Sequence, residues 1–278
     1  MKRAVSETKH AQKGENAPRT LSEAAYQCLR RDVLWGELEP GMALRSDSLR
    51  KRYDIGSSPL REALTRLACE GLVHSSEQRG FRVAPLEKDH VRDVLNARIL
   101  IESEAVRRSI EYGDVDWETG ILSSNHQLSK MLNKPGYEPE STAWCEIHRG
   151  FHFALMDACG SEWLLKMASM LYDQAERHRL VAENRRVARE AAGVTTARAS
   201  SRLREHKNLT DAALARDSEK TIKMLTRHHV QTAEYVLVCL DADSDSVDSS
   251  ETSAATNKSA AKRQPKSNAK QKARKAFG

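Results

Sequence analysis

This 278-residue sequence lacks the patterns that are typical of membrane and secreted proteins. It has no run of about 18 apolar residues, which a membrane-spanning helix requires, and its first residues, MKRAVSETKHAQKGENAPRT, lack the apolar core of a signal peptide. The five cysteines are an odd number and form no C-x-x-C pair. We therefore expect a cytoplasmic protein with no membrane partner, whose thiols are reduced and mostly buried.

Aromatic residues and common catalytic signatures are also scarce. Phe, Trp and Tyr make up 5% of the chain while Leu and Ala are plentiful, which favours a mostly helical fold over a β-sandwich. There is no G-x-S-x-G motif and no glycine-rich phosphate loop, and Arg149 after His148 rules out H-E-x-x-H. The enzyme classes that depend on these motifs are not expected.

Charge is distributed unevenly along the chain. Residues 258–278 contain eight Lys or Arg and no acidic residue, and residues 1–20 have a net charge of +3. Residues 86–257 have a net charge of −6. This pattern favours a protein that meets a polyanion with only part of its surface.

Both ends of the chain have the composition of disordered tails. Residues 1–19 and 242–278 are polar and contain almost no large apolar side chains, so they cannot bury enough surface to offset the entropy of ordering. The basic C-terminal tail has two interpretations. It can add non-specific contacts with DNA phosphates, or it can be a solubilising extension.

Residues 20–85 have the pattern of a small helical domain with a hairpin. Three amphipathic segments separated by turn residues come first, and the third has Pro59 in its first turn. The stretch EQRGFRVAPL follows, with strand-like runs on both sides of Arg79 and Gly80. Helix, short helix, helix and hairpin in this order predict a winged helix-turn-helix domain whose third helix enters the major groove of DNA.

Several polar side chains of this domain are placed to contact DNA. Arg61 lies one turn into the third helix, where it can reach a guanine edge or a phosphate. Serines at the start of that helix can donate to phosphates, and a basic hairpin tip suits the minor groove. The alternative is an ordinary solvated face. The predicted DNA-binding residues are Arg45, Ser57, Ser58, Arg61, Arg79 and Gly80.

Beyond residue 86 the helical period dominates, and glycine and proline separate the segments. We predict an all-helical bundle over residues 86–241, so that the whole chain is mainly α with a small β-hairpin wing. The expected helices lie near 87–112, 115–134, 141–159, 162–182, 201–215 and 218–240.

Two histidines share one face of an expected helix. The stretch EIHRGFHFAL places His148 and His152 four residues apart, and imidazole is a good ligand for Zn, Ni, Cu and Fe. Two imidazoles at this spacing can close on one ion. By itself, such a pair is more often a packing or surface feature.

The motif LREALTRLACEGLV, with QRGFRVA after it and GELEPGMALRSDSLRKRY before it, resembles the N-terminal domain of GntR-type bacterial transcription regulators. The helical remainder resembles the FCD effector domain of the FadR branch, and the similarity covers about residues 20–240. YDIGSSPLREAL and CGSEWLLKMASMLYDQAERHR look most like the CsiR type of repressor. The resemblance implies a homodimeric, metabolite-responsive repressor that binds a pseudo-palindromic operator in double-stranded DNA. While it is bound to DNA, such a repressor is associated with the bacterial nucleoid.

The resemblance also implies a ligand site. A divalent metal, Zn or Ni, is the implied cofactor, and a small carboxylate, such as the dicarboxylate glutarate, is the implied effector. Arg98 matches an FCD arginine that can clamp a carboxylate, although a surface ion pair with Glu102 at i+4 is the alternative. The metal-ligand spacing of FCD domains falls on His148, His152, His206 and His228.

Two positions depart from the family pattern. Many members carry Arg where this chain has Ser57, so one bidentate base contact, typically about 1 to 3 kcal/mol of discrimination, is missing. His148 stands where the usual site has Asp, so an effector carboxylate would be the main charge that neutralises a bound ion. Two other functions remain open at this point: a His-metal enzyme in the helical bundle, and a DNA-compacting protein that uses its basic tail.

Overall fold

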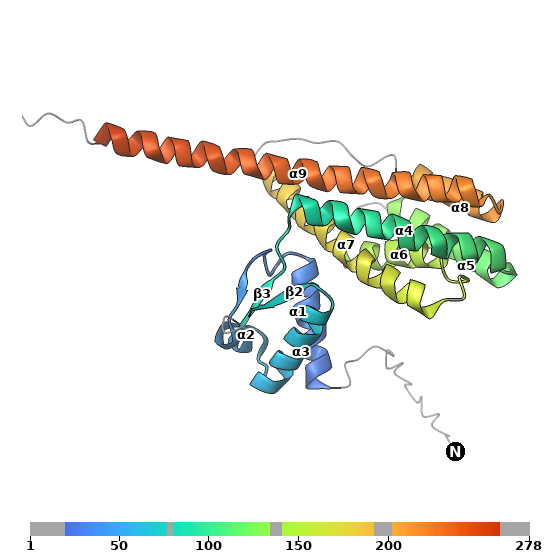
Figure 1. Ribbon diagram of the computed structural model, residues 1–278, viewed down its shortest axis with the longest axis horizontal. Helices are drawn as coiled ribbons and strands as arrows, with labels where there is room; N and C mark the ends of the chain where they lie inside the picture. The colour runs from blue at the N-terminus through green and yellow to red at the C-terminus, as the bar shows by residue number, and fades with distance from the viewer. Residues whose placement is uncertain (1–19, 77–79, 134–140, 192–201, 262–278) are drawn as a thin grey trace, which may run out of the picture.

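The computed structural model describes residues 20–76, 80–133, 141–191 and 202–261. Within them, an N-terminal head of three helices and a small sheet is joined to a body of long helices (Figure 1). The predicted class, mainly α with a winged helix-turn-helix head and an all-α body, is confirmed. The predicted tail 1–19, the final part of the predicted C-terminal tail and Arg79 lie outside the described residues.

The head is formed by α1 (Leu21–Leu34), α2 (Ser46–Tyr53) and α3 (Ser57–Cys69) around one apolar core. Thr20 caps α1, because its side chain accepts a hydrogen bond from the Glu23 N–H at 3.1 Å. Leucines at helical spacing on α1 and α3 face each other and exclude water. The leucines of the head that are at most 1% exposed are Leu29, Leu38, Leu60, Leu64, Leu67 and Leu72.

The sheet of the head is antiparallel and has the order β1-β3-β2. Its strands are β1 (Ala43–Leu44), β2 (Val73–Ser76) and β3 (Gly80–Val83). The hairpin of β2 and β3 was predicted, and Gly80 opens β3 with a φ of 77°, a conformation that favours glycine. The two-residue strand β1 was not predicted, because a strand this short has no periodicity to detect.

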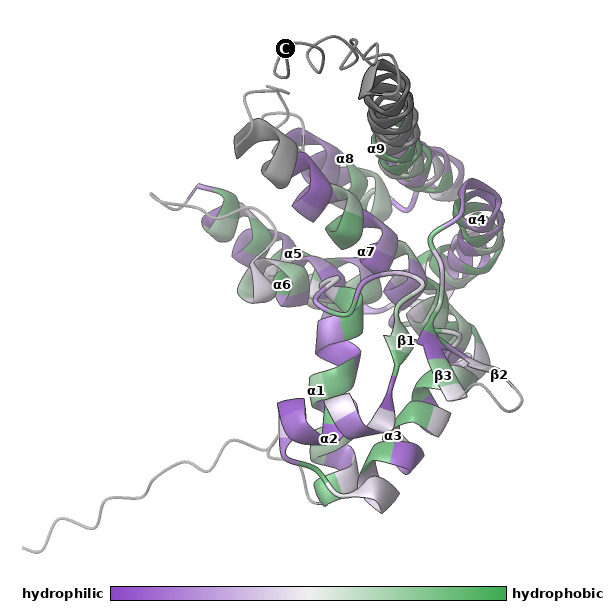
Figure 2. Cartoon of the chain, turned by 90° about the vertical axis from the view of Figure 1, so that its left-hand side faces the viewer, coloured by the Kyte–Doolittle hydropathy of each residue, from purple (hydrophilic) through white to green (hydrophobic). Residues whose placement is uncertain are grey.

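The body contains six helices within the described ranges: α4 (Lys88–Tyr112), α5 (Val115–Leu132), α6 (Thr142–Ala154), α7 (Glu162–Ala191), α8 (Arg202–Leu214) and α9 (Ser218–Ala261). Hydrophobic and hydrophilic residues alternate along them, as expected for amphipathic helices (Figure 2). A core that includes Ile121, Leu128, Phe151 and Leu155 lies between them. None of the helices over the described residues combines the length and the apolar character that crossing a bilayer needs.

Helix α9 continues 20 residues beyond 241, the position where we expected the body to end and a disordered tail to begin. A helix usually stops at glycine or proline, and the sequence contains neither between Leu240 and Pro265. The polar composition of this segment therefore did not reveal where the helix ends. The remaining tail, 262–278, is outside the described residues.

Side chains of helix α7 connect the body to the head by donating hydrogen bonds to backbone carbonyl oxygens of the head and of the linker that follows it. Arg177 is fully buried, and its Nη2 donates to the carbonyl oxygens of Ala84 and Pro85 in the linker between β3 and α4. Gln174 donates to the Glu70 carbonyl at 2.8 Å. Two turns beyond Arg177, Asn184 donates to the carbonyl oxygen of Trp35, the residue after α1. Burial lowers the pKa of Arg177 to about 10, and its Nε and Nη1 have no hydrogen-bond partner among the described residues.

Candidate DNA-binding surface and histidine site

The exposed face of α3 carries the predicted DNA-reading residues. Leu60 and Leu64 point into the core of the head, so Ser57, Ser58 and Arg61 are left on the solvent side. The residue before the helix is Gly56, which offers no side-chain cap, so the first N–H groups of α3 face outward. Arg45, before α2, and Gly80, at the start of β3, are also exposed.

The two arginines of α3 have different environments. Arg66 donates to Glu23 at 2.7 Å and lies over the ring of Tyr26, so it fastens α3 to α1. Arg61 is exposed and forms no ion pair among the described residues. An arginine without an internal partner can bind an external anion at no cost to the fold. Arg66 is therefore an example of an ordinary surface arginine that is paired within the fold. Arg61 differs from it because it has no such pair.

Four histidines from three helices meet inside the body. His148 and His152 come from α6, and the other two are His206 of α8 and His228 of α9. One ring nitrogen from each lies within 4.8 Å of the others, and His148 Nε2 is 3.1 Å from His206 Nε2 and 3.2 Å from His152 Nε2. Four nitrogens at about 2.1 Å from a tetrahedral ion would be about 3.4 Å apart. The spacing is close to that of a metal site.

The surroundings keep His152 in the neutral form that binds metals. Burial, followed by the charges of His148 and the other cluster histidines, lowers the pKa of His152 well below 6.5. His148 Nδ1 is 3.1 Å from the Tyr172 hydroxyl, and His228 Nδ1 is 3.3 Å from a Glu205 carboxylate oxygen. These contacts fix the orientation of both rings, as outer partners of metal ligands do, and His148 has its Nε2 in the cluster.

Arg98 does not lie at the surface, which corrects the alternative of a surface ion pair. Its Nε donates to Glu102 at 2.6 Å, as the i+4 spacing predicts, but both side chains are buried and line or adjoin the histidine cavity. Glu102 also lies 2.8 Å from His229 Nε2. Burial acts to raise the pKa of Glu102, but Arg98 and His229 outweigh it and hold that pKa at about 2. His229 is outside the group of four close nitrogens.

Three further residues that the sequence did not single out line the same cavity, which has a volume of about 60 Å³. They are Tyr172, Glu176 and Arg179 of α7. Arg179 donates to Glu176 through two nitrogens, at 2.5 and 3.0 Å, and lies over the Trp144 ring. Burial raises the pKa of Glu176 to about 7. The charged sequence of α7 looks like a solvated helix, so no signal in it indicated a buried role.

A winged helix-turn-helix head with an exposed recognition helix, joined to a helical body, defines a DNA-binding transcription regulator. Residues 21–83 match the bacterial regulatory proteins of the gntR family, and residues 93–231 match the FCD domain. The chain therefore belongs to the gntR family and carries an FCD domain, as predicted. The alternative of a His-metal enzyme is not supported, because this family consists of transcription regulators.

The relatives agree with this assignment. The chain is 38% identical over 213 residues to the HTH-type transcriptional regulator BphR of Paraburkholderia xenovorans, which covers 76% of this chain and 82% of the relative. It is 34% identical over 203 residues to the HTH-type transcriptional repressor GlaR of Escherichia coli, with coverages of 73% and 90%. The solved structure of E. coli McbR/YncC has a TM-score of 0.63 at 18% identity over 78% of this chain and 97% of that chain, which shows a shared fold.

Proposed function

We propose that this regulator is a metabolite-responsive repressor whose affinity for its operator is set by a divalent metal and a small carboxylate in the histidine cavity. The close approach of four buried imidazole nitrogens, all within 4.8 Å, is the observation that supports this most. Neutral imidazoles carry one proton each, and where two unprotonated ring nitrogens face each other no hydrogen bond can form and their lone pairs repel. A cation removes that conflict.

On the DNA side, we propose that a homodimer places one α3 in each half of a pseudo-palindromic operator. The proposed contacts are Arg45, Ser57, Ser58, Arg61, Arg79 and Gly80. Arg61 supplies the guanidinium that can read a base or bind a phosphate, and Ser57 offers only a hydroxyl. Base discrimination should therefore be weaker at the position that family members read with an arginine.

The proposed metal is Zn or Ni, held by His148, His152, His206 and His228. With four imidazoles bound, the ion would take a carboxylate oxygen as a fifth ligand. All four ligands are neutral, so the effector carboxylate neutralises part of the charge of the ion, and Arg98 and Arg179 line the same cavity. Its volume of about 60 Å³ suits an ion and one carboxylate head. The second carboxylate of glutarate would need the cavity to widen.

Calorimetry with Zn²⁺ and Ni²⁺ tests this proposal. Wild-type protein should bind one ion per chain, and His152→Ala should abolish this binding because it removes one of the four close nitrogens. His126→Ala is the matched control, because His126 is exposed on α5. Short mono- and dicarboxylates are then titrated with and without metal. If the carboxylate affinity does not change when the metal is removed, the proposed coupling of metal and effector is wrong.

A further inference from the structure

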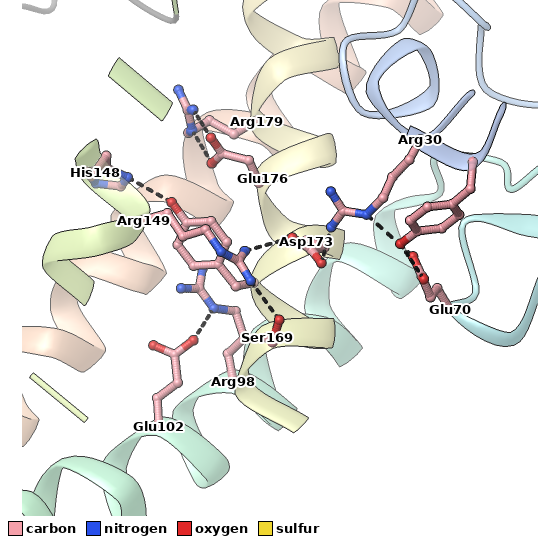
Figure 3. Close-up of polar contacts among 12 residues, drawn as sticks. Arg30, Glu70, Arg98, Glu102, His148, Arg149, Ser169, Asp173, Glu176 and Arg179 are labelled. Atoms are coloured by element: carbon pink, nitrogen blue, oxygen red, sulfur yellow. Dashed lines mark hydrogen bonds and ion pairs between the residues drawn. The ribbon is translucent and has the colours of Figure 1, made fainter. Parts of the chain in front are cut away.

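Asp173 of α7 is shared between the body and the head. Its Oδ1 accepts a hydrogen bond from Arg149 Nη1 of α6 at 2.7 Å, and its Oδ2 accepts one from Arg30 Nη2 of α1 (Figure 3). The side chain is 17% exposed. One carboxylate thus holds two guanidinium groups that belong to different parts of the molecule.

The body side of this contact leads to the histidine cavity. Arg149 follows His148 directly in the sequence, and its Nη2 donates to Ser169 at 2.6 Å. Its guanidinium lies 4.8 Å from the centre of the Tyr172 ring, and the Tyr172 hydroxyl contacts His148 Nδ1 at 3.1 Å. A displacement of His148 or Tyr172 would therefore move a direct partner of Asp173.

The head side leads to the end of the recognition helix. Arg30 Nε lies 3.5 Å from a carboxylate oxygen of Glu70, the residue that follows α3. Glu70 is held further by the Tyr26 hydroxyl at 2.6 Å, and its carbonyl accepts a hydrogen bond from Gln174, the neighbour of Asp173. Figure 3 shows this succession of contacts from His148 to Glu70.

We propose that Asp173 is the positioning residue through which the occupancy of the histidine cavity changes the setting of the recognition helix. This inference rests on the proposed function. The two guanidinium groups bond different oxygens of one rigid carboxylate, so a shift of Arg149 that rotates this group also moves the oxygen bonded to Arg30, which gives two arrangements of the contact. A ligand that stabilises one of these two arrangements changes the affinity of the protein for DNA. Binding of DNA changes the affinity for that ligand by the same factor.

The test uses Asp173→Asn in the full-length protein. Asparagine keeps the shape but has one acceptor oxygen and no charge, so it cannot hold both guanidinium groups. The DNA probe is a duplex that the metal-free wild type selects from a random library, and the ligand probe is Zn²⁺ alone. In the wild type, Zn²⁺ should change the Kd for this duplex by about fivefold or more. In Asp173→Asn, we expect a change of less than about twofold, with the affinity for Zn²⁺ itself retained.

The matched control is Asp89→Asn. Asp89 is an exposed aspartate on α4 whose carboxylate bonds Arg92 at 2.8 Å, and it is not among the residues that line the cavity. It should respond to Zn²⁺ like the wild type. A merely structural role of Asp173 would lower the melting temperature and weaken DNA binding equally with and without Zn²⁺, so the ratio of the two Kd values separates the interpretations. Arg30→Lys, which keeps the charge but loses the fork, gives a second measurement if Asp173→Asn does not fold.

Each outcome decides one of the two proposals. If Zn²⁺ does not bind the wild type, the metal part of the proposed function fails, and this inference fails with it. If Zn²⁺ binds but leaves the wild-type Kd for the duplex unchanged, or if both Asp173→Asn and Arg30→Lys respond like the wild type, the role of Asp173 is refuted while the metal site stands. If the variants keep their affinity for Zn²⁺ but their Kd for the duplex no longer responds to Zn²⁺, the role of Asp173 is supported.

Discussion

His178 should make the body sensitive to acid. Its side chain is buried on α7, with 2% of the residue exposed, and its ring packs edge-on against His90 with centroids 5.3 Å apart. The Nε2 atom has no hydrogen-bond partner among the described residues. Burial, and after it the charge of Arg177, lower the pKa of His178 from 6.5 to about 3.

The direction of the effect follows from the two pKa values. The unfolded chain takes up a proton on this ring near pH 6.5, whereas the folded chain takes it up only near pH 3. The free energy of unfolding therefore decreases as the pH falls from 6.5 towards 3. Between pH 7.5 and 5.0 the expected loss from His178 is about 2 kcal/mol.

Urea unfolding at pH 7.5 and 5.0, with a chelator present, measures this loss. His178→Leu has a similar volume and no titratable group, so its free energy of unfolding should fall by about 2 kcal/mol less than that of the wild type over this interval. His126→Leu, which changes an exposed histidine, should keep the wild-type loss. If His178→Leu loses as much stability as the wild type, the imidazole is not held neutral in the fold and the reasoning is wrong.

Three further predictions concern the head and the tail. Arg61→Ala should weaken operator binding by about 10- to 100-fold in an anisotropy titration, because it removes the unpaired cation of α3, whereas Arg107→Ala on α4 should not. Leu64→Ala, at a site 1% exposed, should lower the free energy of unfolding by about 2 to 5 kcal/mol, and a urea midpoint equal to that of the wild type would contradict the described core. Removal of 262–278, with seven Lys or Arg, should flatten the salt dependence of DNA binding; an unchanged slope would exclude tail contacts.

Most of the fold was predictable because its signals are local. The apolar period of α3, the proline in its first turn and the glycine of the hairpin each depend on a few neighbouring residues. Helix ends were less predictable. Helix α6 ends at Ala154 rather than near 159, and α9 passes 241, because packing and the absence of stop residues decide these ends.

The candidate site was predictable only in part. The spacing of His148 and His152 placed two imidazoles on one face, but their approach to histidines of α8 and α9 is a tertiary contact that only the family resemblance suggested. Glu176 and Asp173 could not be selected, because α7 carries charged residues on every side and its sequence does not distinguish a buried carboxylate from a solvated one.

The hydrogen bonds from Arg177 to the main chain of the linker have a consequence for building chimeric regulators. The guanidinium contacts the carbonyl oxygens of Ala84 and Pro85, and every residue type provides a carbonyl. A foreign DNA-reading module could therefore be grafted at the linker without matching side chains there, provided that the path of the main chain and an arginine at the place of Arg30 are preserved. The proposed effector would then act on operators of different sequence through the same body.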